Sequence, residues 1–171
     1  MVQAGTLSAS GETVGLQSRE GKYLTFSLAN QEYGIGILEI REIIGMMPIT
    51  AIPQAPGFVR GVINLRGKVI PIVDFRLKFG MAGAEQTEKT CMIVVSVKGS
   101  QGEILIGLVV DSVSEVMNIK EADIENAPSF GTEMNTDFIL GMAKINNGVK
   151  ILLDIDRVLN VEEIQNVVES A

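Results

Sequence analysis

The chain has 171 residues, a length that suits one domain or a pair of small, closely joined subdomains. Hydrophobic residues make up 46% of it and aromatic residues only 5%, so a sizeable core is possible and must be mainly aliphatic. The net charge of −7, together with the lack of any Lys/Arg cluster, argues against nucleic acid and anionic membrane surfaces as partners.

Residues 1–20 are rich in Gly, Ser, Ala and Gln and show no sustained period, which predicts a flexible N-terminal tail. From residue 21 onward, short β-branched and aliphatic runs alternate with Gly, Asn and Pro turns, which is typical of β-barrels. The predicted strands are Tyr23–Leu28, Tyr33–Ile37, Phe58–Leu65, Val69–Phe75, Cys91–Val97, Ile104–Val110, Phe138–Ile145 and Val149–Ile155.

Two segments carry helical spacing. Apolar residues at positions 38, 40, 43 and 44 predict a short helix over Leu38–Ile44, and Asp156–Val168 predicts a C-terminal helical tail within residues 156–171. Residues 80–89 are small and polar and predict a loop. No apolar run approaches the about 18 residues of a membrane span, so we expect a cytoplasmic protein without direct membrane insertion.

The sequence also contains a weak internal duplication. Tyr33–Ile44 aligns with Ile106–Met117, which pairs Gly34 with Gly107 at an offset of 73 positions, and Phe58–Arg66 aligns with Phe138–Asn146 at an offset of 80. After one extra residue, Gly67 aligns with Gly148 at an offset of 81. These matches predict two similar halves, each with a glycine-marked strand, a short helix and a later hairpin. The alternative is that apolar alternation with glycine recurs by chance in a β protein.

The sequence gives little support for a catalytic function. The chain has no histidine, the commonest general base and the commonest metal ligand. Gly34-Ile-Gly36 lacks the third glycine of a dinucleotide site, and Cys91 opens an apolar run in which a small buried side chain is expected. We therefore expect no enzyme activity, no metal and no cofactor.

The segment Pro56–Arg76 predicts a hairpin that turns at Leu-Arg-Gly-Lys, because Gly67 can take the positive φ of a tight turn. Arg66 then lies at the hairpin tip, where a guanidinium can bind a carboxylate through two hydrogen bonds, although a turn arginine without a partner is commoner. In the second copy, Asn146 takes the place of Arg66, so any charged contact at this tip belongs to the first copy only.

This segment closely resembles the signature of the CheW-like domain family. The similarity extends through Glu32–Ile35, Gly107–Val113 and Ile151–Asp156, so it covers about residues 20–160. The resemblance implies a mainly β domain over residues 21–160, built as two intertwined, SH3-like, five-stranded β-barrel subdomains with short accessory helices. The second subdomain is expected mostly from about residue 90 to 150.

The resemblance also implies a function. Members of the family are adaptors that connect the cytoplasmic tips of transmembrane chemoreceptors to the regulatory domain of the histidine kinase CheA, so recruitment to membrane-bound receptor arrays is expected. The implied receptor-binding residues are Ile40, Gly61, Arg66, Val113 and Val116. The implied kinase-binding residues are Glu42, Met47 and Ile49.

Two other interpretations of the sequence stay open at this point. The chain could be a CheW-like module of a larger signalling protein, such as a CheV coupling protein or the regulatory domain of CheA itself. It could also be a small ligand-binding β-barrel, or an enzyme whose base is Glu or Lys. Binding to receptor and kinase fragments, compared with binding of metabolites, separates these functions.

Overall fold

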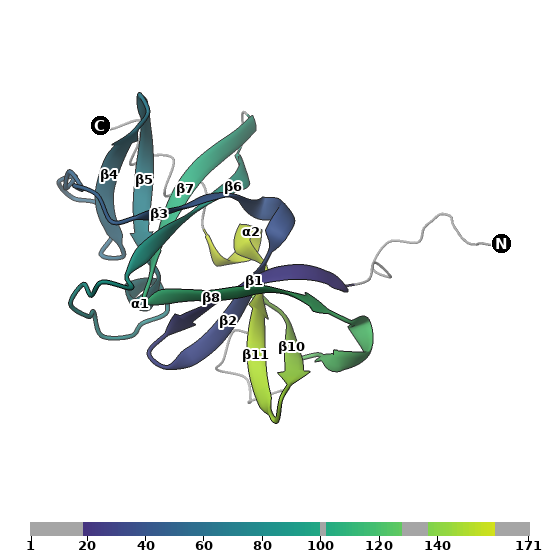
Figure 1. The fold of residues 1–171 in the computed structure, drawn as a ribbon. Helices are drawn as coiled ribbons and strands as arrows, with labels where there is room; N and C mark the ends of the chain where they lie inside the picture. The colour runs from purple at the N-terminus through teal and green to yellow at the C-terminus, as the bar shows by residue number, and fades with distance from the viewer. Residues whose placement is uncertain (1–18, 100–101, 128–136, 160–171) are drawn as a thin grey trace.

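A computed structural model describes residues 19–99, 102–127 and 137–159, and every structural statement below concerns these residues. The mainly β fold predicted from the sequence is confirmed, because the strands in these ranges form two sheets (Figure 1). Most of the predicted N-terminal tail, and the predicted C-terminal helix beyond residue 159, lie outside the described residues. In the described part of the chain, no helix is long and apolar enough to cross a bilayer.

The strands form one sheet of five strands and one sheet of six strands. The five-stranded sheet has the order β3-β6-β7-β5-β4, formed by β3 (Ile40–Gly45), β4 (Val59–Leu65), β5 (Lys68–Asp74), β6 (Cys91–Gly99) and β7 (Gly102–Val110). The six-stranded sheet has the order β8-β1-β2-β11-β10-β9, formed by β1 (Gly21–Leu28), β2 (Gln31–Gly36), β8 (Ser112–Ile119), β9 (Ile124–Glu125), β10 (Ile139–Ile145) and β11 (Gly148–Leu153). Short helical turns are η2 (Ile37–Glu39), α1 (Phe75–Lys78), η3 (Glu121–Asp123) and α2 (Ile155–Val158).

The two sheets exchange strands. The chain crosses from the six-stranded to the five-stranded sheet at η2 and returns at Asp111, between β7 and β8. The hairpins β4–β5 and β10–β11 lie at opposite ends of the molecule (Figure 1). The span expected for the second subdomain, about 90–150, therefore holds β6 and β7 of one sheet as well as strands of the other. Closure of each sheet into a barrel stays a prediction.

Strand register confirms the internal duplication. Gly34 on β2 lies opposite Leu152 of β11 in a parallel pair, and Gly107 on β7 lies opposite Ile72 of β5 in another. A Cβ atom on Gly34 would lie 2.8 Å from the Leu152 side chain, and one on Gly107 would lie 2.6 Å from the Ile72 side chain. Both glycines are needed for the same reason, because a larger neighbour occupies the space above them.

Bulges recur at the same offsets. Pairing of β3 with β6 shifts at Arg41, between Ile40 and Glu42, and pairing of β8 with β1 shifts at Ser114, which is 73 positions later. The hairpin bulges before Gly61 and Gly141 are 80 positions apart. Such irregularities are specific features of a strand. The two halves therefore share their backbone geometry, which chance alternation does not explain.

The helix predicted over Leu38–Ile44 is wrong. Only η2 is helical there, and the rest is the edge strand β3. The bulge at Arg41 is the cause, because it brings Ile40 and Ile43 onto one face of the strand although they are three positions apart, the spacing that indicates a helix. The short helix expected in the second copy is likewise the strand β8, where Val113 and Val116 flank the bulge at Ser114.

A single core joins the sheets. Leu24 and Phe26 of β1, Ile93 and Val95 of β6 and other buried side chains of both sheets form what we call the shared core. Separate clusters lie on the far faces, around Tyr23 in the six-stranded sheet and around Ile63, Ile70, Ile72, Met92 and Val109 in the five-stranded sheet. We call the second of these the outer cluster. Side chains of both sheets therefore pack together in the shared core.

Candidate functional site

An apolar rim borders the shared core on the outermost strands β3 and β8. Ile40 and Ile43 pair with Val95 and Ile93, and Val113 and Val116 pair with Phe26 and Leu24, all four partners being buried in that core. Directly paired residues share one face of a sheet, so these four side chains continue the core toward solvent. We call Ile40, Ile43, Val113 and Val116 the core rim.

The core rim is partly exposed. Val116 is 50% exposed and Ile43 is 45% exposed, whereas Ile40 and Val113 are half-buried against the shared core. Large aliphatic side chains at solvent on two edge strands form a surface suited to an apolar partner. Ile43 was not among the residues implied by the resemblance. The duplication could have found it, because residue 43 matches residue 116 at the offset of 73.

A charged cleft of about 570 Å³ opens on the opposite face of β3 and β6. Val94 lines this cleft, whereas its neighbour Val95 points into the shared core. Arg41 on β3 binds Glu103 on β7 at 2.6 Å, and Ser96 Oγ donates to the same carboxylate at 2.7 Å. The cleft and the β3 part of the core rim therefore lie on opposite faces of the five-stranded sheet.

Arg66 lies at the entrance of the cleft and binds Glu42. Its Nη2 atom donates to both carboxylate oxygens of Glu42, with a distance of 2.7 Å to Oε2. Arg66 occupies the β4–β5 turn with φ of 50°, followed by Gly67 with φ of 89°. The structure thus joins a residue implied to bind the receptor to one implied to bind the kinase.

The Arg66–Glu42 pair is accessible. The Arg66 side chain is 71% exposed. Ion pairs this open to water contribute at most about 1 kcal/mol to folding, because solvent screens them and holding two side chains costs entropy. The pair is therefore better suited to present a fixed charge to a partner than to stabilise the fold.

Met47 and Ile49 follow β3 and pack on the outer cluster. Both side chains are half-buried there, beside Ile44 and Leu65. They fasten the segment after β3 to the five-stranded sheet, close to Glu42. Their exposed portions remain available to a partner, but most of their apolar surface is already used within the fold.

Gly61 is buried and has a structural reason to be glycine. A Cβ atom at this position would lie 2.0 Å from the Thr50 carbonyl oxygen, and φ is +141°. Thr50 exchanges two backbone hydrogen bonds with Val62, at 2.8 and 2.9 Å, so the chain passes directly over Gly61. Gly61 can therefore influence a partner only through the position of Thr50 and the strand below it.

Glu39 on η2 is a half-buried carboxylate that two nearby carboxylates repel. Its Oε2 atom is buried and has no hydrogen-bond partner within the described part of the chain. Burial first, and then the charges of Asp156 and Asp154, raise the pKa of Glu39 from 4.5 to about 7.

The described ranges of the chain hold no cluster of His, Cys, Asp or Glu side chains suited to a metal ion. Burial also raises the pKa of the Cys91 thiol, which disfavours the reactive thiolate.

The raised pKa of Glu39 predicts a pH-dependent stability. Between pH 4.5 and about 7 the folded state binds more protons than the unfolded state, so the free energy of unfolding falls as pH rises through this window. We expect Glu39→Gln to raise the free energy of unfolding at pH 8 by about 1 kcal/mol, a value reduced for partial exposure, and to change it little at pH 4.5. Urea unfolding at both pH values measures this.

Glu88→Gln, at an exposed glutamate in the irregular segment before β6, is the matched control and should show no such difference between the two pH values. Equal effects of Glu39→Gln at pH 4.5 and pH 8 would contradict the assignment of the titration to Glu39.

Comparisons with known proteins all point to the same family. Residues 22–163 match the model of the CheW-like domain family. The chain is 38% identical to the chemotaxis protein CheW of Klebsiella aerogenes, over 94% of this chain and 93% of that protein. It is 38% identical to the CheW protein of Rhizobium meliloti, over 82% and 88% respectively. The crystal structure of the scaffolding protein TtCheW from Thermoanaerobacter tengcongensis superposes with a TM-score of 0.73 at 35% identity, covering 84% of this chain and 95% of that one.

Proposed function

Because the chain belongs to the CheW-like domain family and is a non-catalytic coupling scaffold of chemotaxis, we propose that it joins the cytoplasmic tips of chemoreceptors to the regulatory domain of CheA. Recruitment of the protein to membrane-bound receptor arrays follows from the first of these contacts. The two relatives described above are named CheW and are matched over 93% and 88% of their length, so the interpretation of the chain as a module of a larger signalling protein is not favoured.

The observation that carries this proposal is the presence of two surfaces of different chemistry, the core rim on β3 and β8 and the charged cleft on the opposite face of β3. The core rim is aliphatic and suits the apolar face of a helical hairpin, as in helix-in-groove recognition. The cleft face carries the Arg66–Glu42 pair and is continuous with Met47 and Ile49. A scaffold needs two such surfaces, since one partner must not displace the other.

We assign the receptor to the core rim, with Ile40, Val113 and Val116 in direct contact. Glu42, Met47 and Ile49 are assigned to the kinase. Arg66 lies on the cleft face rather than on the core rim, so its implied receptor contact is a second, separate one, and through its bond to Glu42 it also orders the kinase-facing side. Each contact can be weak, because simultaneous binding of several partners in an array raises occupancy through effective concentration.

Val116→Asp tests the receptor assignment. A carboxylate at this half-exposed position opposes an apolar contact, so we expect the affinity for a receptor cytoplasmic fragment to fall at least tenfold and the affinity for the CheA regulatory domain to stay unchanged. Calorimetric titration with each fragment measures both. The matched control is Val149→Asp on β11, since Val149 is 47% exposed and lies outside both surfaces.

Equal loss of receptor affinity in Val116→Asp and Val149→Asp would contradict the assignment of the core rim. The proposed function itself fails if the unaltered protein binds neither fragment. A shift of the unfolding temperature with small metabolites, found together with that result, would favour the ligand-binding barrel instead.

A further inference from the structure

Asp111 is the single residue between β7 of the five-stranded sheet and β8 of the six-stranded sheet. Its backbone N–H donates to the Ser27 carbonyl oxygen at 3.1 Å, and its Oδ2 atom accepts a bond from the Ala29 backbone N–H at 2.9 Å. Ser27 and Ala29 belong to the end of β1 and the turn that follows it. Asp111 therefore fastens the crossover to the six-stranded sheet.

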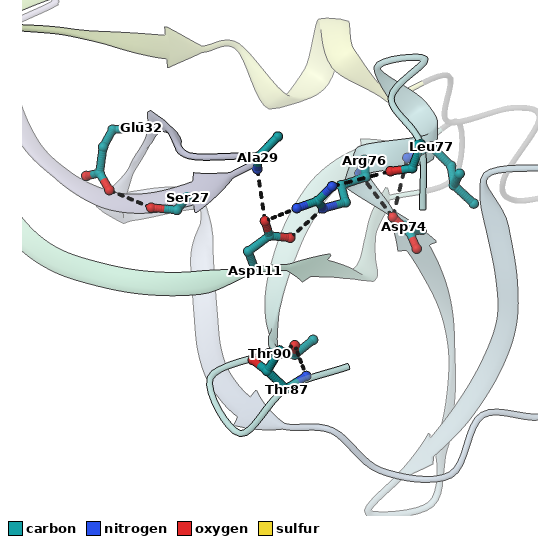
Figure 2. A network of polar contacts seen from close by, with 10 residues as sticks. Ser27, Ala29, Glu32, Asp74, Arg76, Leu77, Thr87, Thr90 and Asp111 are labelled. Atoms are coloured by element: carbon teal, nitrogen blue, oxygen red, sulfur yellow. Dashed lines mark hydrogen bonds and ion pairs between the residues drawn. The ribbon is translucent and has the colours of Figure 1, made fainter. Parts of the chain in front are cut away.

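The same carboxylate also binds the other half of the molecule. Arg76 of α1, which directly follows β5, donates from Nε to Oδ1 at 2.8 Å and from Nη2 to Oδ2 at 2.6 Å. Asp74 caps α1 by accepting from the Arg76 backbone N–H at 3.0 Å, which fixes the start of this helix. Figure 2 shows dashed lines from the Asp111 carboxylate to the Ala29 N–H and to the Arg76 guanidinium.

The Arg76–Asp111 pair is stronger than an ordinary surface pair. It has the bidentate geometry in which guanidinium and carboxylate match best, and both side chains are mostly shielded from solvent. The bond from Arg76, followed by the bond from the Ala29 N–H, holds the pKa of Asp111 below its usual range. The carboxylate thus stays charged in neutral solution, and both of its bonds persist.

We call the Arg76–Asp111 ion pair, together with the bond from the Ala29 N–H, the clasp. The other crossover between the sheets, at η2, is the counterpart of this one in the first copy of the duplication. Strand register keeps the second offset at 80, rather than 81, beyond the hairpin turn, because Ile72 pairs with Gly107 and Leu152 pairs with Gly34. Asp111 then corresponds to Leu38 and Arg76 corresponds to Asp156, so the described residues at η2 hold no equivalent of this ion pair. There, Glu39 faces Asp154 and Asp156, which repel it. The ion pair therefore fastens the sheets at one crossover, whereas at the other Asp156 accepts a 3.4 Å bond from the Lys98 backbone N–H and lies near the like charge of Glu39.

We propose that Asp111 is a positioning residue for receptor binding: through Arg76 and the Ala29 N–H it holds the two sheets at the spacing that sets β8 against β3. This inference rests on the proposed function. The core rim takes residues from both sheets, whereas Glu42, Met47 and Ile49 all lie on or next to the five-stranded sheet. Loss of the clasp must therefore affect the receptor contact and spare the kinase contact.

Asp111→Asn tests the proposal, because asparagine keeps the shape and loses the charge that binds Arg76. At a temperature where the variant is fully folded by circular dichroism, we expect receptor affinity to fall about tenfold and affinity for the CheA regulatory domain to stay within twofold. Asp111→Glu keeps the charge and should recover part of the loss. The control Glu125→Gln removes the 2.5 Å pair with Lys144, which lies within one sheet, and should change neither affinity.

A distance measurement gives a readout that does not depend on partners. In a Cys91→Ser background, spin labels at Lys98 on β6 and Asn118 on β8 report the spacing of the sheets, and we expect Asp111→Asn to broaden that distance distribution. An unchanged distribution with unchanged receptor affinity would overturn the proposal, as would equal losses for receptor and kinase. If the unaltered protein binds no receptor fragment, the proposed function fails while the label distances still test the clasp.

Discussion

Replacing Gly61 with alanine is expected to lower the free energy of unfolding by about 3 kcal/mol or more. The added Cβ would lie 2.0 Å from the Thr50 carbonyl oxygen, and the φ of +141° is a conformation that side chains rarely adopt. Backbone atoms of Thr50 cannot move aside without breaking the two hydrogen bonds to Val62. Urea denaturation followed by circular dichroism measures the loss.

Gly57→Ala is the matched control for this prediction. A Cβ on Gly57 meets no atom within 4 Å and its φ lies outside the left-handed region, so we expect a change within about 1 kcal/mol. The resemblance implies that Gly61 contacts the receptor. A Gly61→Ala variant with full stability and lost receptor binding would favour that direct contact over the structural role argued here.

Reversing the charge at Arg66 is expected to have the largest effect on binding. In Arg66→Glu, two carboxylates face each other at the entrance of the charged cleft, and the site loses the cation that it presents. We expect affinity for both the receptor fragment and the CheA regulatory domain to fall at least tenfold, with little change in stability because the pair is exposed. Calorimetric titration and urea unfolding check the two parts.

A charge swap separates two roles of Arg66. The double variant Glu42→Arg with Arg66→Glu restores an ion pair in reverse. If Arg66 acts by ordering Glu42, affinity returns in part, and if Arg66 itself binds a carboxylate of a partner, it does not. Lys144→Glu, a reversal at an exposed pair on β10, is the control and should leave both affinities unchanged. Unchanged affinity of Arg66→Glu for both partners removes it from the site.

Local sequence patterns predicted much of the fold. Each of the eight predicted strands overlaps an observed strand, and the turn at Arg66 and Gly67 has the positive φ angles that a tight hairpin turn needs. The matching turn of the second copy is also confirmed, because Asn146 and Asn147 have positive φ angles there. These features depend on neighbours in the chain. That is why a single sequence specifies them.

What the sequence missed depends on distant residues. Strand β8 escaped prediction because the bulge at Ser114 disturbs its alternation, and a bulge is fixed by the partner strand β1. The pairing of Arg66 with Glu42 joins residues 24 positions apart, and that of Arg76 with Asp111 joins residues 35 apart. No local period encodes either contact. The division of the site residues between two faces likewise follows from strand pairing.

The exchange of strands between the sheets has a consequence for how the protein is made. Strand β2 pairs in parallel with β11, so Tyr33 meets Ile151, near the other end of the described chain. Pairings between such distant segments close large loops and slow folding. During synthesis, the β1–β2 hairpin must wait for β11 to leave the ribosome before it meets this partner, whereas the five-stranded sheet is already complete in sequence at Val110. The five-stranded sheet can therefore form first, and the six-stranded sheet is completed last, when β11 joins β2.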